Sequence, residues 1–334
     1  MIYPKYIKKG GFIGVTAPSD GLSKKLDLVR FDNSIKKLKE YGLNLIETPN
    51  VRKSLNNRSS DKKIRAKEFM NFITNDKVKY LICASGGEFL NEMIPYIDLE
   101  EIKKNPKWIQ GYSDITGITY LITTKLDIAT SYSFTIKPYG MEPWDKALNN
   151  SLELLEGKRN VVESSELYEN SYKEYKTGLE TFNLDTKNKW IALNKKECEG
   201  RIIGGCLEVI DNFIGTKYDY TTEFVERYLK DGFVWYFDIF NMDNNTIIRK
   251  LWQFKESGYF KNIKGLILGK RGFGEDYSSK SFRKDLLELF DKENISIVLE
   301  ADISHKGPLM TVINGSLAKV KVEGGKGTIE YIFK

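Results

Sequence analysis

Residues 108–115, with the sequence WIQGYSDI, are the most informative stretch of this chain. Their apolar beginning predicts a short buried strand, and a serine and an aspartate follow it at once. A helix is predicted directly after these two residues, because apolar side chains then recur every three or four positions, at Ile115, Ile118, Leu121 and Ile122. A strand, a tight turn and a helix in this order are typical of βαβ units, which build a largely parallel sheet.

The same alternation extends toward the N-terminus. Buried strands are predicted at residues 11–16, 43–47 and 78–84. Helices with one apolar face are predicted between them at residues 28–41 and 60–73, and a third helix is expected after Gly87. The first half of the chain is therefore predicted to be an α/β domain around a largely parallel sheet.

The second half repeats this pattern after a polar interruption. Residues 163–196 are rich in Tyr, Glu and Lys and have no clear period, which is typical of a connection between domains. Apolar strands are then predicted at 233–237, 265–268 and 295–299, and the tail alternates around a Gly-rich turn as a hairpin does. We therefore expect an N-terminal domain over 1–165, a connection over 166–195 and a smaller C-terminal α/β domain over 196–334.

Composition excludes several classes of protein. The 334 residues are 41% hydrophobic and 29% charged, which is typical of a globular protein and not of a disordered or fibrous one. The net charge of +6 is spread along the chain and is not gathered into one patch, so no nucleic-acid partner is expected. No apolar run approaches the roughly 18 residues of a membrane helix, so we expect a cytoplasmic protein without a membrane partner.

Cysteine and histidine content limits the possible chemistry. The three cysteines, Cys83, Cys198 and Cys206, lack the paired CxxC spacing of a zinc site, and we interpret them as buried thiols. The chain has one histidine, His305, and no transition-metal site is predicted. Neither a dinucleotide fingerprint nor a GxxxxGK[ST] loop occurs, which excludes NAD and nucleoside triphosphates as cofactors.

Ser113 has two interpretations. A serine at a sharp turn from strand to helix exposes its hydroxyl beside backbone N–H groups, as in the nucleophile elbow of hydrolases. The elbow pattern GxSxG is incomplete here, because Ile115 occupies the position of the second glycine. The alternative is that Ser113 or Asp114 is only a helix N-cap.

A serine nucleophile needs a base, and His305 is the single imidazole in the chain. It lies in a loop after the strand predicted at 295–299, and loops at strand ends often carry functional residues, although a surface histidine is the alternative. Asp238 follows the strand predicted at 233–237 and is a candidate for the orienting acid, with Asp243 as a nearby substitute.

The turn Ser85-Gly86-Gly87-Glu88 follows another predicted strand. Its free N–H groups could form part of an oxyanion hole, or the turn could simply need glycine.

These motifs resemble the LD-carboxypeptidases of serine peptidase family S66, which include muramoyl-tetrapeptide carboxypeptidases and microcin C immunity proteins. The resemblance extends over nearly the whole chain, and GYSDIT is its most specific motif. The matching residues are GVTAPS at 14–19, Gly86-Gly87, NPKW at 105–108, GYSDIT at 111–116, GGCL at 204–207 and the loop around His305.

The resemblance implies a Rossmann-like N-terminal domain, a smaller C-terminal domain, an active site in the cleft between them and a homodimer. It places the nucleophile on Ser113, the base on His305 and the oxyanion donors on the N–H groups of Gly87 and Asp114. The implied substrate is a small peptide that ends in a D-amino acid, such as a cytoplasmic murein tetrapeptide in peptidoglycan recycling. The implied reaction needs no metal or cofactor.

Three residues depart from the family pattern. Asp238 stands where the family acid is a glutamate, Cys206 where an asparagine is usual, and Ser85 where many members have an arginine. An acid shorter by one methylene must approach the imidazole by about 1 Å to orient it.

These departures leave two alternatives open. One is a microcin C immunity-like amidase that acts on peptidyl or aminoacyl nucleotide conjugates. In it, Trp190 or another aromatic residue of the connection would be the stacking platform for the nucleobase. The other is a non-catalytic binding protein with a weakened triad.

Overall fold

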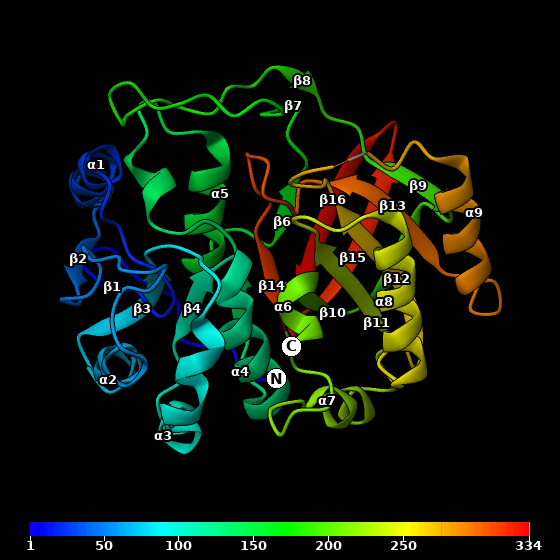
Figure 1. Cartoon of the computed structure of the whole chain (residues 1–334), viewed down its shortest axis with the longest axis horizontal. Helices are drawn as coiled ribbons and strands as arrows, with labels where there is room; N and C mark the ends of the chain where they lie inside the picture. The colour runs from blue at the N-terminus through cyan, green and yellow to red at the C-terminus, as the bar shows by residue number, and fades with distance from the viewer. Residues whose placement is uncertain (275, 334) are drawn as a thin grey trace.

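The computed structural model describes residues 1–274 and 276–333 of the chain. Its strands form two large sheets and one two-stranded ribbon, and helices pack around the sheets (Figure 1). The predicted α/β class is confirmed, because the centre of each large sheet is built from parallel strands.

The first sheet has the strand order β14-β5-β4-β3-β1-β2. The bounds of its strands are β1 (Phe12–Thr16), β2 (Asn44–Glu47), β3 (Val78–Cys83), β4 (Trp108–Gly111), β5 (Thr130–Tyr132) and β14 (Val312–Asn314). Neighbouring strands are parallel except β14, which pairs antiparallel with β5. The carboxyl ends of β3 and β4 therefore lie at one edge of the sheet, which is where sites form in α/β proteins.

Helices and 3-10 helices surround this sheet. The helices are α1 (Lys25–Tyr41), α2 (Lys62–Ile73), α3 (Leu99–Lys104), α4 (Thr116–Leu126) and α5 (Lys146–Leu155), and the 3-10 helices are η1 (Leu90–Tyr96), η2 (Ser113–Ile115) and η3 (Lys137–Gly140). The helix expected after Gly87 is the 3-10 helix η1. It contains Pro95, and a proline lacks the N–H that an α-helix interior uses.

The second sheet has the strand order β6-β16-β15-β10-β11-β12-β13-β9. Its strands are β6 (Val161–Glu163), β9 (Ile191–Asn194), β10 (Glu197–Cys206), β11 (Phe233–Asp238), β12 (Ile263–Gly269), β13 (Ser296–Ala301), β15 (Leu317–Glu323) and β16 (Lys326–Ile332). Strands β10 to β13 are parallel, and the predicted terminal hairpin is the antiparallel pair β15–β16. The helices of this half are α6 (Leu207–Asp211), α7 (Thr221–Arg227), α8 (Asn244–Glu256) and α9 (Lys280–Leu289).

Two strands cross between the halves of the chain. Strand β6, from the N-terminal half, pairs with β16 in the second sheet, and β14, from the C-terminal half, pairs with β5 in the first. We propose that each sheet is the centre of one domain. Strands β6 and β14 would then each belong to the domain on the other side of the connection expected at 166–195.

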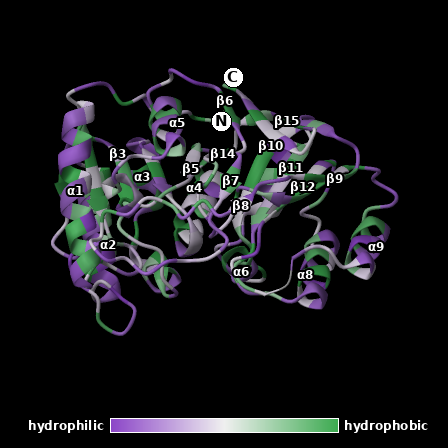
Figure 2. Ribbon diagram, turned by 90° about the horizontal axis from the view of Figure 1, so that it is seen from above, coloured by the Kyte–Doolittle hydropathy of each residue, from purple (hydrophilic) through white to green (hydrophobic). Residues whose placement is uncertain are grey.

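The two sheets share one apolar core. Val15 and Tyr80 of the first sheet belong to the same cluster of buried side chains as Ile202 and Val234 of the second. In Figure 2 the hydrophobic colour concentrates on the central strands, whereas α1 carries long hydrophilic bands. This common core fixes the position of the strand ends of one sheet relative to those of the other. In residues 1–274 and 276–333, no helix combines the length and apolar character needed to cross a bilayer.

The polar connection forms a strap. Strands β7 (Leu167–Tyr168) and β8 (Thr186–Lys187) pair as an antiparallel ribbon, and most of the chain between them, residues 169–183, extends over the upper side of the molecule toward α1 (Figure 1). We call residues 169–183 the strap.

Candidate active site

Ser113 lies on a sharp turn at the carboxyl end of β4. Tyr112 is extended, Ser113 adopts the left-handed region with φ of +62°, and η2 and α4 follow directly. A left-handed non-glycine residue costs about 1–2 kcal/mol, so the surrounding fold must hold it in place. A methyl group on Gly111 would lie 2.7 Å from Ile115 Cγ2, so this turn requires glycine before it.

Neither candidate cap residue caps the helix. The residues at the N-caps of η2 and α4, Tyr112 and Ile115, make no side-chain cap hydrogen bond. The Asp114 carboxylate instead accepts hydrogen bonds from Ser19 Oγ at 2.5 Å and from the Leu90 N–H at 2.9 Å. Burial raises the pKa of Asp114, and these two hydrogen bonds partly oppose the shift. Asp114 therefore ties the turn to its neighbours and does not serve as an N-cap.

The glycine turn after β3 packs against Ser113. A methyl group on Gly86 would lie 3.0 Å from Ser113 Cβ and 3.2 Å from Ser113 Oγ. Gly87 has φ of +153°, and a methyl group there would lie 2.3 Å from Ser19 Oγ. Among the described residues, the Gly87 N–H has no hydrogen-bond acceptor. This turn brings a free donor close to the serine.

Asp238 and His305 meet at the carboxyl ends of the second sheet. Asp238, the last residue of β11, is completely buried, and its Oδ1 lies 3.0 Å from Nδ1 of His305, whose side chain is 10% exposed. The rings of Phe240 and Tyr112 pack on the imidazole with centroid distances of 4.6 and 5.3 Å. The shorter acid therefore reaches the imidazole in this structure.

The charges around His305 favour its protonated form. Burial lowers the pKa of this imidazole, but the charge of Asp238, its hydrogen bond and the charge of Glu208 outweigh burial and raise the pKa above its ordinary value. Glu208 also fixes the chain beside the imidazole, because its Oε1 accepts the N–H groups of Phe240 and Asn241 at 2.9 and 2.8 Å. A neutral His305 is thus reached only at a pH above this raised pKa.

Tyr132 links the two sets of residues, and sequence reasoning missed it. Its hydroxyl donates to Asp238 Oδ2 at 2.7 Å and accepts the Ser113 N–H at 3.2 Å. Ser113 Oγ and His305 are not joined by a direct hydrogen bond in the part of the chain that the structure describes, although Tyr112, next to Ser113, packs on the imidazole. No motif marks Tyr132, and no strand is predicted from the sequence at residues 130–132, where β5 lies.

Two other candidates have structural roles. Asp243 is the N-cap of α8 and accepts the Thr246 N–H at 2.9 Å, so it does not contact His305 as the suggested substitute acid would. Cys206 Sγ is buried and donates to Glu208 Oε2 at 3.2 Å, and burial raises its pKa well above the ordinary thiol value. It behaves as the buried thiol that the sequence predicts.

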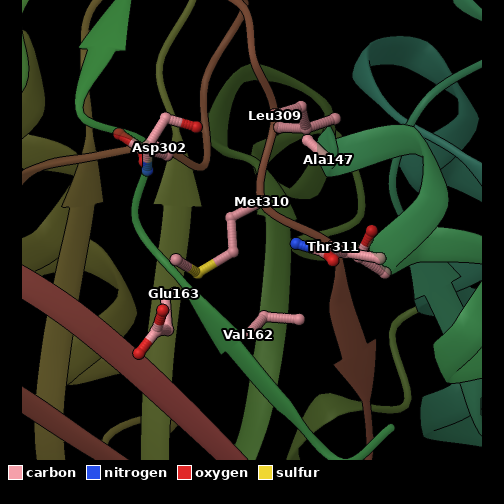
Figure 3. A pocket seen from close by; sticks show the side chains of 9 residues that line it. Ala147, Val162, Glu163, Asp302, Leu309, Met310 and Thr311 are labelled. Carbon is pink, nitrogen blue, oxygen red and sulfur yellow. The ribbon is translucent and has the colours of Figure 1, made fainter. Parts of the chain in front are cut away.

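A buried ion pair anchors the loop that carries His305. Lys270 Nζ lies 2.6 Å from Asp302 Oδ1, and both side chains are almost fully buried. Asp302 also accepts the Ser165 N–H at 2.8 Å, and its carbonyl accepts the Met310 N–H at 2.7 Å. Figure 3 shows Asp302 and Met310 beside a small pocket on this side of the loop. Both ends of the loop are thereby fixed.

Lys270→Met is expected to lower the free energy of unfolding by about 3–5 kcal/mol, because Asp302 would keep a buried charge without its cation. Urea unfolding followed by tryptophan fluorescence measures the change. Lys321→Met, which removes an exposed pair with Glu323, is the control and should leave the unfolding midpoint in place. Equal midpoints for the two variants would contradict the anchoring role of Lys270.

A cavity of about 1080 Å³ opens beside His305. It is bordered by Tyr112 and His305 on one side and by the strap on another. Arg30 of α1 donates to the carbonyls of Gly178 and Glu180 at 3.1 and 2.7 Å, which attaches the strap to α1.

The strap is also attached to the His305 loop. The Tyr172 hydroxyl donates to the His305 carbonyl at 2.6 Å, and the Glu169 N–H donates to the Gly307 carbonyl at 2.7 Å. Trp190 is buried below Gly327 and lies outside the cavity, so it is not the aromatic platform; Tyr172 and Tyr175 line the cavity. Within the described ranges, no group of three or more His, Cys, Asp or Glu residues is arranged to hold a metal ion.

Comparison with protein families gives a match in each half of the chain. Residues 13–133 match the LD-carboxypeptidase N-terminal domain, and residues 199–320 match the LD-carboxypeptidase C-terminal domain, both of peptidase family S66. The Ser113 turn lies in the first matched region, and Asp238 and His305 lie in the second.

The relatives are named either as carboxypeptidases or as an immunity protein. A Vibrio cholerae protein named as a carboxypeptidase is 26% identical, over 99% of this chain and 96% of its own length. The microcin C7 self-immunity protein MccF of Escherichia coli is 26% identical, over 90% of this chain and 87% of its own. A Bacillus subtilis protein named as a murein peptide carboxypeptidase is 23% identical, over 79% and 73%.

Solved structures agree with the fold. An MccF-like protein from Streptococcus pneumoniae, solved in complex with AMP, superposes with a TM-score of 0.78 at 25% identity, covering 97% of this chain and 99% of that one. The fold is thus shared over nearly the whole chain.

Proposed function

We propose that this chain, which belongs to the LD-carboxypeptidase family (serine peptidase family S66), is a serine hydrolase. The bond that it is proposed to cleave is the amide between an L-centre and a D-amino acid. Its proposed substrate is a murein tetrapeptide from which it removes the terminal D-alanine during cytoplasmic peptidoglycan recycling. The proposal includes the homodimer that the family resemblance implies.

The observation that carries this proposal is the hydrogen bond between His305 Nδ1 and Asp238 Oδ1 at the edge of the cavity. A carboxylate on one imidazole nitrogen fixes the tautomer whose other nitrogen, Nε2, can accept a proton. The Ser113 turn approaches the same place through Tyr132 and Tyr112. Catalytic hydrogen bonds are often long in a free enzyme and shorten when substrate binds, so the proposal requires Ser113 Oγ to approach Nε2 in the complex.

In the proposed reaction, Ser113 Oγ attacks the carbonyl carbon while His305 Nε2 accepts the hydroxyl proton. The negative charge that develops on the carbonyl oxygen is stabilised by the N–H groups of Gly87 and Asp114. His305 then donates the proton to the departing amine, and the C–N bond breaks to leave an acyl-serine. Water, deprotonated by His305, hydrolyses this ester and regenerates the hydroxyl.

The lining of the cavity is compatible with a peptide that ends in a carboxylate. Six Lys or Arg side chains line it, Lys24, Lys25 and Lys173 among them, together with five carboxylates. Cations attract the terminal carboxylate that distinguishes a carboxypeptidase substrate from an internal peptide bond.

A second candidate is cleavage of aminoacyl or peptidyl nucleotide conjugates, as an immunity-type amidase. The observation that favours it is the pair of tyrosines, Tyr172 and Tyr175, that the strap contributes to the cavity, since flat aromatic rings are suitable stacking surfaces for a nucleobase. A third outcome, a binding protein without turnover, follows if the proposed catalytic residues are inactive.

A panel of substrates separates these candidates. Purified protein is incubated with murein tri-, tetra- and pentapeptides and with one peptidyl-adenylate analogue, and release is followed by mass spectrometry. Release of D-alanine from the tetrapeptide alone is the expected result. Cleavage of the adenylate analogue alone would favour the amidase, and a folded protein that binds members of the panel without cleaving any would identify a binding protein.

A further inference from the structure

We propose that Tyr132 is a positioning residue that holds both the acid and the nucleophile turn of this site; this inference rests on the proposed function. Tyr132 is the last residue of β5, and its side chain is completely buried. Its hydroxyl uses both of its hydrogen-bonding capacities on the site, as a donor to Asp238 and as an acceptor from the Ser113 N–H.

The two oxygens of Asp238 have different partners. Oδ1 contacts His305 Nδ1 at 3.0 Å, and Oδ2 accepts the Tyr132 hydroxyl at 2.7 Å. A carboxylate that is bound at both oxygens cannot rotate about its Cβ–Cγ bond without losing a charge-assisted hydrogen bond. Cys206, which pairs with Asp238 in the sheet, directs its Sγ to Glu208 and so supplies no second donor. Tyr132 is therefore the side chain that fixes the carboxylate for the imidazole.

The proton of this hydroxyl stays in place over the working pH range. Burial, with the negative charge of Asp238 as the next cause, raises the pKa of Tyr132 well above its ordinary value. The titratable groups near Asp238 and His305 come from several neighbouring elements: Glu208, Tyr112, Tyr172, Tyr236, Tyr277 and Cys206. The raised pKa of Tyr132 keeps its hydroxyl protonated near neutral pH, so the hydroxyl remains a donor to Asp238.

The second contact acts on the Ser113 turn. Ser113 has a left-handed backbone, and its N–H would otherwise be a donor without a partner in a partly buried position. Tyr132 accepts this N–H, and its ring is held by edge contacts with Tyr112 at 6.5 Å and with Tyr236 at 5.6 Å between centroids. One rigid ring thus sets the distance between the end of β4, which carries the serine, and the end of β11, which carries the acid.

Tyr132→Phe keeps the ring and removes both hydrogen bonds, and it is the first variant to test. Without the hydroxyl, Asp238 Oδ2 loses its donor and more negative charge remains opposite the imidazole. The pKa of His305 is expected to rise by about 1 unit, since a charge-assisted hydrogen bond is of that size. The kcat for the best substrate of the panel should fall roughly 10- to 100-fold with little change in KM, because the site geometry is loosened and substrate contacts are kept.

Because His305 is the single histidine of the chain, its imidazole can be titrated by NMR in the whole protein without any substrate. This measurement tests the role of Tyr132 even if no peptide is cleaved, so its failure can be told apart from failure of the proposed function. Tyr331→Phe is the matched control: it is equally buried, and it loses a hydrogen bond of the same length, 2.7 Å, to the Thr311 carbonyl. It should leave the His305 titration unchanged.

A second variant keeps the proposal testable if Tyr132→Phe does not fold. Replacement of Tyr132 by 3-fluorotyrosine through a suppressor tRNA retains the hydroxyl and makes it a stronger donor, so the pKa of His305 should move down instead of up. Opposite shifts for the two variants, or the downward shift alone, support the inference. The inference is overturned if both Tyr132 variants have the same His305 titration and the same kcat as the wild type and Tyr331→Phe.

Discussion

Replacement of Ser113 by alanine is expected to lower kcat about 10⁶-fold and to abolish covalent labelling by a serine-directed phosphonofluoridate. The reason is that Oγ is the atom proposed to form the acyl bond, and it lies on the strained turn against Gly86. The hydroxyl of Ser19, which lies beside Gly87, is already bound to the Asp114 carboxylate. The variant should stay folded, with a free energy of unfolding within about 0.5 kcal/mol of the wild type, because the Ser113 hydroxyl has no hydrogen-bond partner among the described residues.

Labelling is measured as a mass increase on the intact protein and located by peptide mapping. Ser171→Ala is the matched control, since Ser171 lies on the exposed part of the strap and its loss should leave the label on Ser113. A label found on another residue of the wild type, or full activity of Ser113→Ala, would exclude Ser113 as the nucleophile.

Asp238→Asn is expected to lower kcat about 10⁴-fold, which is the usual effect of replacing the acid that orients a catalytic histidine by its amide. The asparagine side chain can present an N–H to Nδ1, and this would favour the wrong tautomer of the imidazole. The pKa of His305 should fall below its raised wild-type value, because burial, which lowers it, is then opposed only by Glu208. NMR titration of the single histidine measures this shift directly.

The same change has a defined effect on stability against pH. In the wild type the folded-state pKa of His305 lies above the unfolded value of about 6.5, so the Asp238–His305 interaction stabilises the fold fully below pH 6.5 and is lost as pH rises through the folded-state pKa. The difference in unfolding free energy between wild type and Asp238→Asn should therefore be larger at pH 5.5 than at pH 9. A difference that grows toward high pH would contradict this linkage.

Asp243→Asn serves as the control for Asp238→Asn. Asp243 is close in the sequence and caps α8, but it does not contact the imidazole, so its replacement should leave the titration of His305 unchanged. This pair of variants also tests the choice between the two aspartates that sequence reasoning alone left open.

For the wild type, the rate of peptide cleavage should rise with pH through the raised pKa of His305, because the proposed base must be neutral to accept the serine proton.

Most of the strands and helices could be predicted from the sequence because their apolar residues keep one period. The stretch at 108–115 is the clearest case: its apolar half is β4, and the turn that follows carries Ser113. The helix after Gly87 is a 3-10 helix, since Pro95 interrupts α-helical bonding in a segment whose apolar spacing is helical. The spacing of apolar residues alone does not distinguish an α-helix from a 3-10 helix, so the helix type could be predicted only by considering the missing N–H of Pro95.

The site was only partly predictable for a different reason. Ser113, Asp238 and His305 stand at strand ends and follow apolar runs, so each could be proposed from its local sequence. Tyr132 could not, because its importance depends on the approach of β5 to β11, a contact between segments 106 residues apart. The strand exchange of β6 and β14 was missed for another reason: strands of three residues at a sheet edge are too short for a period to be visible.

The position of β14 has a consequence for biosynthesis. Strand β5, which ends at Tyr132, completes its pairing only with residues 312–314, so the nascent chain emerges from the ribosome with this edge open until those residues have been translated. His305 emerges only a few residues earlier. The serine turn and its partners are thus assembled only after residues 305–314 have been made, and a shorter nascent chain carries the serine without the histidine that is proposed to activate it.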